Sequence, residues 1–346
     1  MKIFKTTVLT LAILAGSLTY AQDEVAEESA VEATEEKPSF SVSGSIDTYY
    51  RSNDYAPNTS FANLPGYALG MANIVLSYEG EKSGFVADLV YGPRGADAVF
   101  NSAGSSNIVN QLYAYYNVND KLTLTLGNFN TFLGYEVISP VANFNYSTSY
   151  MFSYGPFSHT GIKADYAVSD NVSIMVAVMN ATDETEADYS DASTFGAQLG
   201  LYGQYINFLS GDDYTQFDFT GGFNISEKLF LGINATTTEL AADASFSGVA
   251  LYPQYTLSDS FSLGIRGEIF SETNGGAGAL YSGALSGSSE DADNTSFTIT
   301  GSYTKGNFIL KPEFRIDTAS ANIYSKNATD FSDNLASFVV AAIYAF

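Results

Sequence analysis

Hydrophobic and polar side chains alternate along most of the chain after residue 38. In the first such segment, small or apolar side chains alternate with serines and an aspartate; they are Phe40, Val42, Gly44 and Ile46. The same period of two returns in further short segments, which include 72–78, 85–91, 112–118, 122–126 and 172–179. Strict alternation predicts β-strands whose two faces meet different surroundings. No stretch of this region shows the 3.6-residue period of an amphipathic helix.

The connections between these segments also alternate, between short polar turns and longer loops. Short turns are expected at 81–83, 119–121, 169–171, 227–228, 258–260 and 305–307. Longer loops are expected at 52–70, 93–107, 131–159, 181–193, 211–214, 240–245, 273–292 and 318–332. Short turns on one side and long loops on the other are typical of a β-barrel that crosses an outer membrane.

The number of strands follows from where the two chain ends must lie. Both ends of such a barrel lie on the short-turn side, so the number of strands is even. An even number requires two strands, 194–201 and 203–210, around a tight turn at Tyr202 and Gly203. In lipid the first and last strands must also pair, because an open edge leaves backbone groups unsatisfied. The pattern predicts an all-β fold, a transmembrane antiparallel up-and-down barrel of about 16 strands within a range of about 14 to 18.

The first 38 residues lack the strand pattern and divide into two parts. Residues 1–21 combine Lys2 and Lys5 with a short apolar run and a small-residue end, which are the features of an export signal peptide. Residues 22–38 hold seven acidic residues and one lysine, which predicts a disordered periplasmic leader. The barrel is therefore expected over 39–346. The chain has no cysteine, which excludes disulfides and thiolate metal sites.

One long connection, residues 131–159, differs from the others because it is rich in Phe and Tyr. Connections of this length are usually functional or disordered, and disordered segments are poor in aromatic residues. We therefore expect an ordered loop that folds back against or into the barrel and narrows its pore. In the predicted topology it is the third loop on the long-loop side.

The net charge of −24 is unevenly distributed, because most acidic residues fall in the leader and the long loops. Screening within about 8–10 Å at physiological salt weakens the effect of this charge on the pore. Alternation assigns a more balanced set of charged side chains to the lumen, namely Asp47, Arg51, Lys163, Arg266, Glu268, Lys311, Glu313, Arg315 and Asp317, with Glu79, Asp88, Asp165 and Asp218. We expect a mild preference for cations that is stronger at low salt. The charged run 311–317 either hydrates the lumen as a salt-bridged wall or guides a substrate.

Four segments resemble the putative beta-barrel porin-2, OmpL-like family; they are 43–50, 127–136, 143–149 and 155–161. The likeness covers nearly all of 39–346. It implies an outer-membrane porin of a Gram-negative bacterium, without an enzymatic role. In sixteen-stranded general porins the third loop folds inward and sets the pore size. By that analogy, the residues expected at the constriction are Tyr135, Glu136, Asn145, Tyr146, Ser149, Tyr150 and Tyr154. The alternative is that the aromatic residues only pack the loop against the wall.

The leading hypothesis for function is passive diffusion of small hydrophilic solutes through a wide lumen. The alternative is a channel selective for sugars or peptides, which would stack on inward-facing tyrosines; these are Tyr49, Tyr113, Tyr115 and Tyr252. Outer-membrane lipid and lipopolysaccharide are the expected surroundings. A homotrimer stays open, because trimers are common among such porins but no pattern here identifies one.

Catalysis and cofactor chemistry are not predicted. A serine hydrolase needs a base beside its serine, and the one histidine, His159, is instead expected to anchor the return of the long loop by a hydrogen bond. The acidic clusters at 183–184 and 290–293 lack the spacing of a calcium loop, so no metal is expected. The negative charge excludes a basic nucleic-acid surface.

Overall fold

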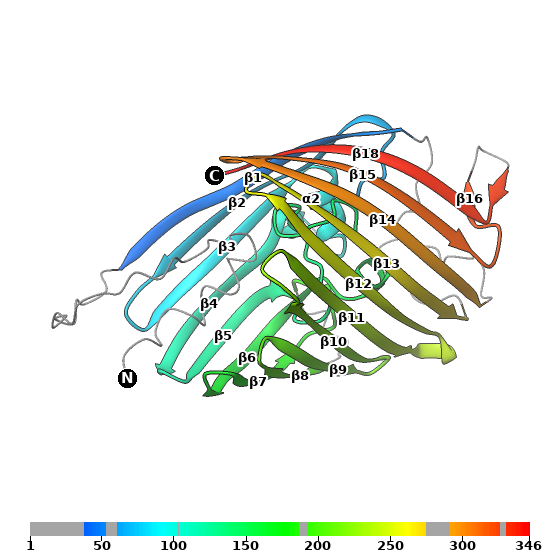
Figure 1. Ribbon diagram of the computed structural model, residues 1–346. Coiled ribbons are helices and arrows are strands. Elements are labelled where there is room, and N and C mark those ends of the chain that lie inside the picture. Colours follow the sequence, from blue (N-terminus) through cyan, green and yellow to red (C-terminus); the bar gives the residue numbers. More distant parts are fainter. Residues whose placement is uncertain (1–37, 53–60, 103, 187–192, 275–290, 326–329) are drawn as a thin grey trace.

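The computed structural model describes residues 38–52, 61–102, 104–186, 193–274, 291–325 and 330–346. This part of the chain forms one closed antiparallel β-barrel (Figure 1). Sixteen strands follow one another around it, and the last pairs with the first, so the predicted strand number is confirmed. The predicted signal peptide and leader lie outside the described residues, except for Pro38.

The barrel strands are β1 (Ser39–Arg51), β2 (Gly66–Glu79), β3 (Ser83–Tyr91), β4 (Val109–Asn119), β5 (Leu122–Asn130), β6 (Ser158–Ser169), β7 (Val172–Met179), β8 (Thr194–Leu201), β9 (Gln204–Gly211), β10 (Tyr214–Asn224), β11 (Leu229–Leu240), β12 (Ser245–Ser258), β13 (Phe261–Thr273), β14 (Ala292–Lys305), β15 (Phe308–Ala319) and β18 (Asn334–Ala345). Closure comes from β1 and β18, which pair from Ser45 opposite Ala345 to Arg51 opposite Val339. A closed ring satisfies the strand edges that lipid would leave unpaired.

Short and long connections alternate around the barrel, with one difference from the prediction. The turn between β8 and β9 consists of Tyr202 and Gly203, with φ angles of 52° and 80°. Two successive positive φ angles are typical of a type I′ hairpin turn, so the predicted pair of strands is confirmed. The connection expected as a longer loop at 211–214 is a turn of only Asp212 and Asp213, because the pairing of β9 with β10 continues to Gly211 opposite Tyr214.

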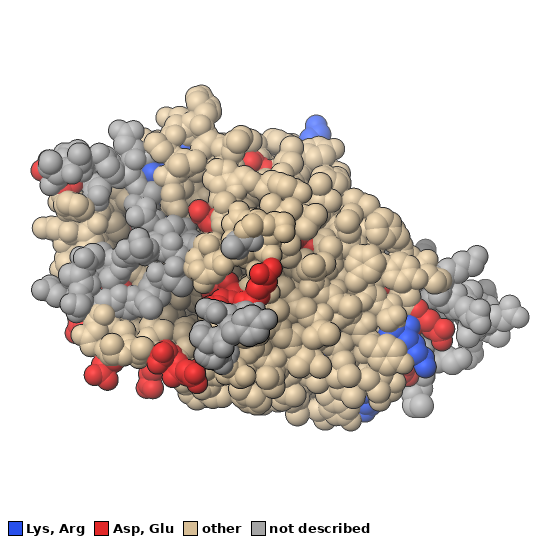
Figure 2. Space-filling model, turned by 180° about the vertical axis from the view of Figure 1, so that it is seen from behind, with Lys and Arg blue, Asp and Glu red and all other residues tan. Residues whose placement is uncertain are grey.

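The two faces of the strands carry different side chains. On β7, for example, Ile174, Val176 and Val178 are exposed on the outer face, whereas Met175 and Ala177 are buried on the inner face. Figure 2 shows a broad outer surface with almost no charged residues to the right of its centre, acidic residues from the centre toward the left, and a small group of acidic and basic residues at the right end. An apolar band between polar rims suits a barrel surrounded by hydrocarbon.

Shorter elements occur in the connections on the long-loop side. They are α2 (Pro93–Ala98), the 3₁₀ helix η1 (Gly104–Ile108), α3 (Tyr150–Tyr154), the 3₁₀ helix η2 (Ala241–Asp243) and a small hairpin of β16 (Tyr324–Ser325) and β17 (Phe331–Ser332). No helix within the described ranges is both long and apolar enough to cross a membrane.

Candidate functional site

The connection between β5 and β6, residues 131–157, is named the third loop from here on. It is two residues shorter than predicted, because strand pairing continues to Ser158 opposite Asn130. The imidazole Nε2 of His159 lies 3.0 Å from the hydroxyl of Thr131, where the loop begins. The hydrogen bond predicted for His159 is therefore present, and it joins the two ends of the loop.

Asp183, in the connection after β7, holds the returning end of the third loop. One carboxylate oxygen accepts hydrogen bonds from the backbone N–H groups of Phe157, at 2.6 Å, and Ser158, at 2.9 Å. Burial raises the pKa of Asp183 to about 7, although these two hydrogen bonds act to lower it. Nothing in the sequence pattern distinguishes this aspartate from its acidic neighbours.

Buried carboxylates of the barrel wall bind backbone N–H groups of the third loop. Glu313 of β15 accepts from the adjacent N–H groups of 146–147, at 2.7 and 3.0 Å. Glu268 of β13 accepts from those of 150–151, both at 2.9 Å. The second pair begins α3, where the first N–H groups of a helix have no partner within it. The wall thus satisfies N–H groups that the loop itself leaves unpaired.

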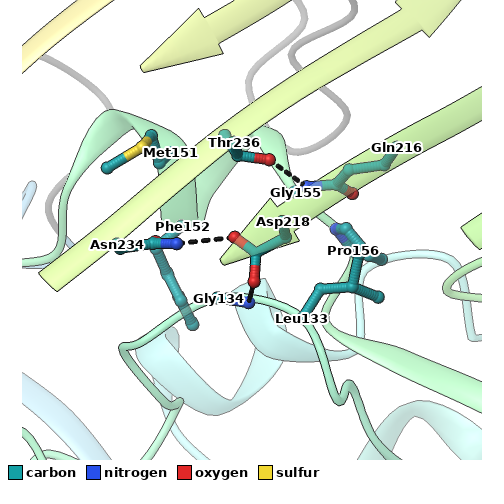
Figure 3. Close-up of a pocket in the computed structure, with 10 residues that line it drawn as sticks. All are labelled: Leu133, Gly134, Met151, Phe152, Gly155, Pro156, Gln216, Asp218, Asn234 and Thr236. Carbon is teal, nitrogen blue, oxygen red and sulfur yellow. Dashed lines mark hydrogen bonds between the residues drawn. The ribbon is translucent and has the colours of Figure 1, made fainter. Parts of the chain in front are cut away.

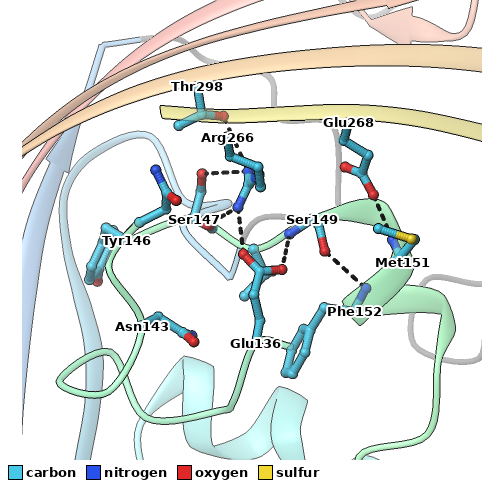
Figure 4. Close-up of polar contacts among 12 residues, drawn as sticks. Glu136, Asn143, Tyr146, Ser147, Ser149, Met151, Phe152, Arg266, Glu268 and Thr298 are labelled. Atoms are coloured by element: carbon cyan, nitrogen blue, oxygen red, sulfur yellow. Dashed lines mark hydrogen bonds and ion pairs between the residues drawn. The ribbon is translucent and has the colours of Figure 1, made fainter. Parts of the chain in front are cut away.

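A buried ion pair lies at the centre of these contacts (Figure 4). Arg266 of β13 binds Glu136 of the third loop at 2.7 Å and donates to the carbonyl oxygen of Ser147 at 2.5 Å. The other carboxylate oxygen of Glu136 accepts the N–H of Ser149 at 2.7 Å. The hydroxyl of Ser149 in turn caps α3 by accepting the N–H of Phe152 at 3.1 Å. Hydrogen bonds between charged groups are stronger than neutral ones, so this arrangement fixes the middle of the loop.

The cations of β15 bind carbonyl oxygens of the third loop. Lys311 donates to two of them, including that of Pro140 at 2.8 Å. Arg315 donates to the carbonyl oxygen of Thr148 at 2.8 Å and pairs with Asp317 at 2.8 Å. These charged side chains are at most 2% exposed. Lys311 and Arg315 therefore hold the third loop. This role differs from both alternatives that the sequence offered for the run 311–317, a hydrated wall and a guide for a substrate.

Tyr146 and Asn145 join the third loop to β1 and β14. The hydroxyl of Tyr146 donates to Asp47, and its ring lies 5.6 Å from that of Tyr49. The side-chain amide of Asn145 donates to the hydroxyl of Thr300 at 2.7 Å. Burial raises the pKa of Tyr146 well above its usual value, so the phenol keeps the proton that it donates.

The remaining tyrosines expected at the constriction pack among aromatic rings. Tyr135 stacks on Tyr252 of β12 with ring centres 4.3 Å apart, and burial raises its pKa to about 12. The hydroxyls of Tyr150 and Tyr324 lie 3.0 Å apart. Tyr154 belongs to the same apolar cluster as Tyr150 and Tyr252. The loop is therefore tied to the wall by ring packing as well as by charge.

Glycines on the inner face of the wall leave room for side chains of the third loop. A Cβ atom added at any of four glycines would lie less than 3.0 Å from a loop side chain, closer than packed atoms come. They are Gly196 on β8 beside Phe132, Gly232 on β11 beside Tyr135, Gly248 on β12 beside Met151, and Gly264 on β13 beside Phe144. The alternating pattern places these glycines on strands but does not reveal that they belong to the site.

Arg94 is the main residue of this site that the sequence pattern does not reveal. It is the second residue of α2, within the connection expected as the loop 93–107, yet its side chain is fully buried. It donates to the carbonyl oxygens of Ile138 at 2.9 Å and Tyr146 at 3.1 Å, and it lies 5.0 Å over the ring of Phe61. No periodicity in a six-residue helix could have shown that it turns inward.

The two other cations that the sequence assigns to the lumen are Arg51 of β1 and Lys163 of β6. Arg51 is buried at the end of β1. Lys163 of β6 pairs with Asp165 at 2.7 Å, and these side chains are 24% and 33% exposed. The pair is therefore far more accessible than the buried ions that hold the third loop.

A closed sixteen-stranded barrel with an apolar outer face and a long loop bound to inward side chains defines an outer-membrane β-barrel of the porin class. The profile of the family described as putative beta-barrel porin-2, OmpL-like, matches residues 39–346, and the chain belongs to this family. It is accordingly an outer-membrane porin, of a family whose members are typically non-enzymatic channels. No curated protein matches the sequence.

Solved porin structures share the fold at low sequence identity. The anion-selective porin from Comamonas acidovorans is 8% identical with a TM-score of 0.58, covering 90% of this chain and all of that one. The trimer form of OmpT from Vibrio cholerae is 10% identical with a TM-score of 0.57 and the same coverage. A loop-deletion mutant of OmpT is 12% identical with a TM-score of 0.54, again with the same coverage. At this identity the likeness shows the fold alone.

Proposed function

We propose that this porin is a passive diffusion channel for small hydrophilic solutes, with a pore narrowed by the third loop and a mild preference for cations. The observation that carries the proposal is the attachment of the loop to side chains of β1, β10, β13 and β15. Sixteen-stranded barrels leave a water-filled channel. A loop bound to several parts of the inner wall reduces the open cross-section.

Removal of part of the third loop tests the constriction. A deletion inside 137–150 removes the partners of the wall ions and is expected to raise the single-channel conductance in planar bilayers. Heat-dependent mobility on a denaturing gel serves as the control that the barrel still folds. A folded deletion variant with unchanged or smaller conductance contradicts the proposed role of the loop.

Reversal potentials in a salt gradient test the preference for cations. The expected potential has the sign of cation selectivity and grows as the salt is diluted, because screening weakens. Clear anion selectivity contradicts this part of the proposal. The anion-selective porin named above shares the fold but, at 8% identity, carries no argument about selectivity here.

A channel selective for sugars or peptides remains the second candidate, because aromatic rings do lie on the inner face. Tyr49 and Tyr252 are at most 4% exposed and pack against Tyr146 and Tyr135 of the third loop, however, so a solute could stack on them only after the loop moved. Saturable block of the conductance by one class of solute favours the selective channel. A trimer, as in OmpT of Vibrio cholerae, is also a proposal for this chain, which chemical cross-linking tests.

A further inference from the structure

The barrel wall is not equally tall around its circumference (Figure 1). Strands β7, β8 and β9 have 8 residues each, whereas β2, β12 and β14 have 14. A strand that crosses a membrane needs about 9–11 residues at the usual tilt. Both connections of β9 are tight turns, 202–203 and 212–213, so the wall ends where the strands end. The wall formed by β7, β8, β9 and β10 is named the low wall from here on.

The outer face of β9 is apolar only between Gln204 and Ser210, where Ile206 is 50% exposed. Gln204 lies on this outer face, because a Cβ added at the outward Gly221 would meet its side-chain oxygen. The hydroxyl of Ser210 lies 3.4 Å from that of its outward neighbour Thr215. The interval from residue 204 to 210 measures about 20 Å along the strand, or about 15 Å across a membrane at a tilt of about 40°. The apolar band of an outer-membrane barrel is about 25 Å tall.

The wall directly across the ring has the height that a membrane requires. Opposite the low wall, β2 carries apolar outward side chains from Tyr67 to Tyr78. This interval measures about 27 Å across the membrane by the same geometry, with a tyrosine at each end. In a bilayer that fits β2, polar groups of Gln204 or of Ser210 and Thr215 would therefore lie in hydrocarbon, which is unfavourable.

The inner face of the low wall is covered by the third loop. Leu133 packs in one apolar cluster with Met175 of β7 and Leu209 of β9. On β10, Asp218 accepts the N–H of Gly134 at 2.9 Å, and a small pocket remains between the loop and β10–β11 (Figure 3). The outer face is therefore the face of the low wall that is left for another molecule.

A second copy of this chain matches the low wall in height, whereas lipid does not. Lipid has to thin beside a short apolar span, at a cost that grows with each ångström, and oligomerisation avoids that cost. A second copy brings polar side chains at the same two depths, so those of one copy meet those of the other.

The low wall also offers enough apolar surface for such a contact. Its large outward side chains are 36–54% exposed; they are Ile174, Val176, Val178, Phe195, Leu199, Ile206, Phe217 and Phe223. Together they present on the order of 600 Å². That area approaches the roughly 800 Å² that each partner buries in a standard interface.

We propose that the low walls of three copies meet around a common axis, so that β7–β10 contacts protein while β18, β1 and β2 face lipid. The inference rests on the trimer proposed above and not on the diffusion function, and it adds the face through which the copies meet. Identical copies form a closed ring when each contact repeats with the right rotation. Asp212 and Asp213 lie at the outer end of the low wall, where dissolved salt screens the repulsion between copies.

Fluorescence of a single tryptophan tests which wall faces lipid, because the chain has no tryptophan of its own. Ile206→Trp lies on β9 of the low wall, and Ile46→Trp on β1, directly across the ring, is its control. The two isoleucines are 50% and 54% exposed. In vesicles of phospholipid with brominated chains, quenching is expected to be at least about twofold weaker for Ile206→Trp, because an interface shields its side chains.

Two results of this experiment overturn the inference. Equal quenching of both variants in a protein that cross-links as a trimer places the contact elsewhere and leaves the trimer intact. Stronger quenching of Ile206→Trp than of Ile46→Trp places the contact on the tall wall. A protein that chemical cross-linking shows to be a monomer overturns the inference and the trimer together, whereas the diffusion function is judged by conductance alone.

A cysteine pair keeps the face testable if Ile206→Trp does not fold. The chain has no cysteine, so an introduced thiol is the only one. Asp213→Cys lies in the turn after β9, and Asp333→Cys, just before β18, is the control; both aspartates are exposed at the outer end of the barrel. A short bismaleimide is expected to join two copies of Asp213→Cys and to leave Asp333→Cys as single chains. Equal cross-linking of both variants, or cross-linking of Asp333→Cys alone, overturns the inference.

Discussion

The two sides of the barrel wall hold the third loop by different physical means. On β13 and β15, buried ions bind the backbone of the loop: Glu268 and Glu313 accept its N–H groups, and Arg266 and Lys311 bind its carbonyl oxygens. On β8, β11 and β12, glycines leave space for side chains of the loop, and the hydrogen bond from Gly134 to Asp218 involves a neutral donor.

The two kinds of contact act on different parts of the third loop: the ionic contacts act on its backbone, and the ring packing acts on its side chains. Bonds to buried ions are strong and directional, so they fix the position of the backbone. Ring packing against glycines fixes where the side chains fit, but individual van der Waals contacts are weak. The loop is therefore expected to stay bound on the ionic side and to yield first on the glycine side, where the pocket lies.

The largest effect is expected from breaking the central ion pair of the ionic side. Arg266→Met leaves Glu136 buried without its cation, which destabilises a protein by about 3–5 kcal/mol. We expect a lower free energy of unfolding, measured by urea titration in lipid vesicles, and a higher single-channel conductance as the loop detaches. Lys163→Gln is the control, because an accessible pair of this kind contributes about 1 kcal/mol or less. Equal effects of the two substitutions contradict the special role of the ionic side.

A smaller effect is expected on filling one of the glycine positions. A Cβ at Gly232 on β11 would overlap the ring of Tyr135, so Gly232→Ala is expected to lower the free energy of unfolding by about 1–3 kcal/mol. Gly267→Ala on β13 is the control, because no atom of the described residues lies within 4 Å of its added Cβ. If both variants unfold at the same urea concentration, the glycines do not serve as space for the loop.

The last prediction concerns the pH dependence of stability and Asp183, whose partners at the return of the loop are backbone N–H groups. Its pKa is raised from 3.8 to about 7 in the folded protein. Between these values the folded state binds more protons than the unfolded state, so stability falls as pH rises, by at most about 1.4 kcal/mol per pH unit. Asp183→Asn is expected to flatten this dependence of the unfolding temperature between pH 4 and 7. Asparagine tolerates the positive φ of 63° at this position. If the unfolding temperature of Asp183→Asn depends on pH as steeply as that of the wild type, Asp183 is not the source of this pH dependence.

Much of the fold could be predicted because its cause is local. Each strand needs one face for hydrocarbon and one for the interior, so outward and inward residues alternate along it with a period of two. The same rule identified the tight turn at Tyr202 and Gly203, since an odd number of strands would leave one chain end on the wrong side. The turn at 212–213 was missed because its acidic residues resemble those of a longer exposed loop.

The site was predicted less completely. Inward charges such as Arg266 and Glu313 follow from alternation, but their partners do not, because those partners lie 119 to 167 residues away along the chain. Arg94 was assigned to an outer loop since a short helix carries no readable period. The glycines opposite Phe132 and Phe144 acquire meaning only when the loop lies against them.

The sequence by itself determined a closed barrel of about sixteen strands and which side chains face inward, because lipid imposes those requirements on every strand separately. Only the tertiary structure decided that the inward charges bind the third loop and that glycines of the wall leave room for its side chains. Such pairings depend on which distant segments meet inside the ring, and alternation along one strand carries no information about that.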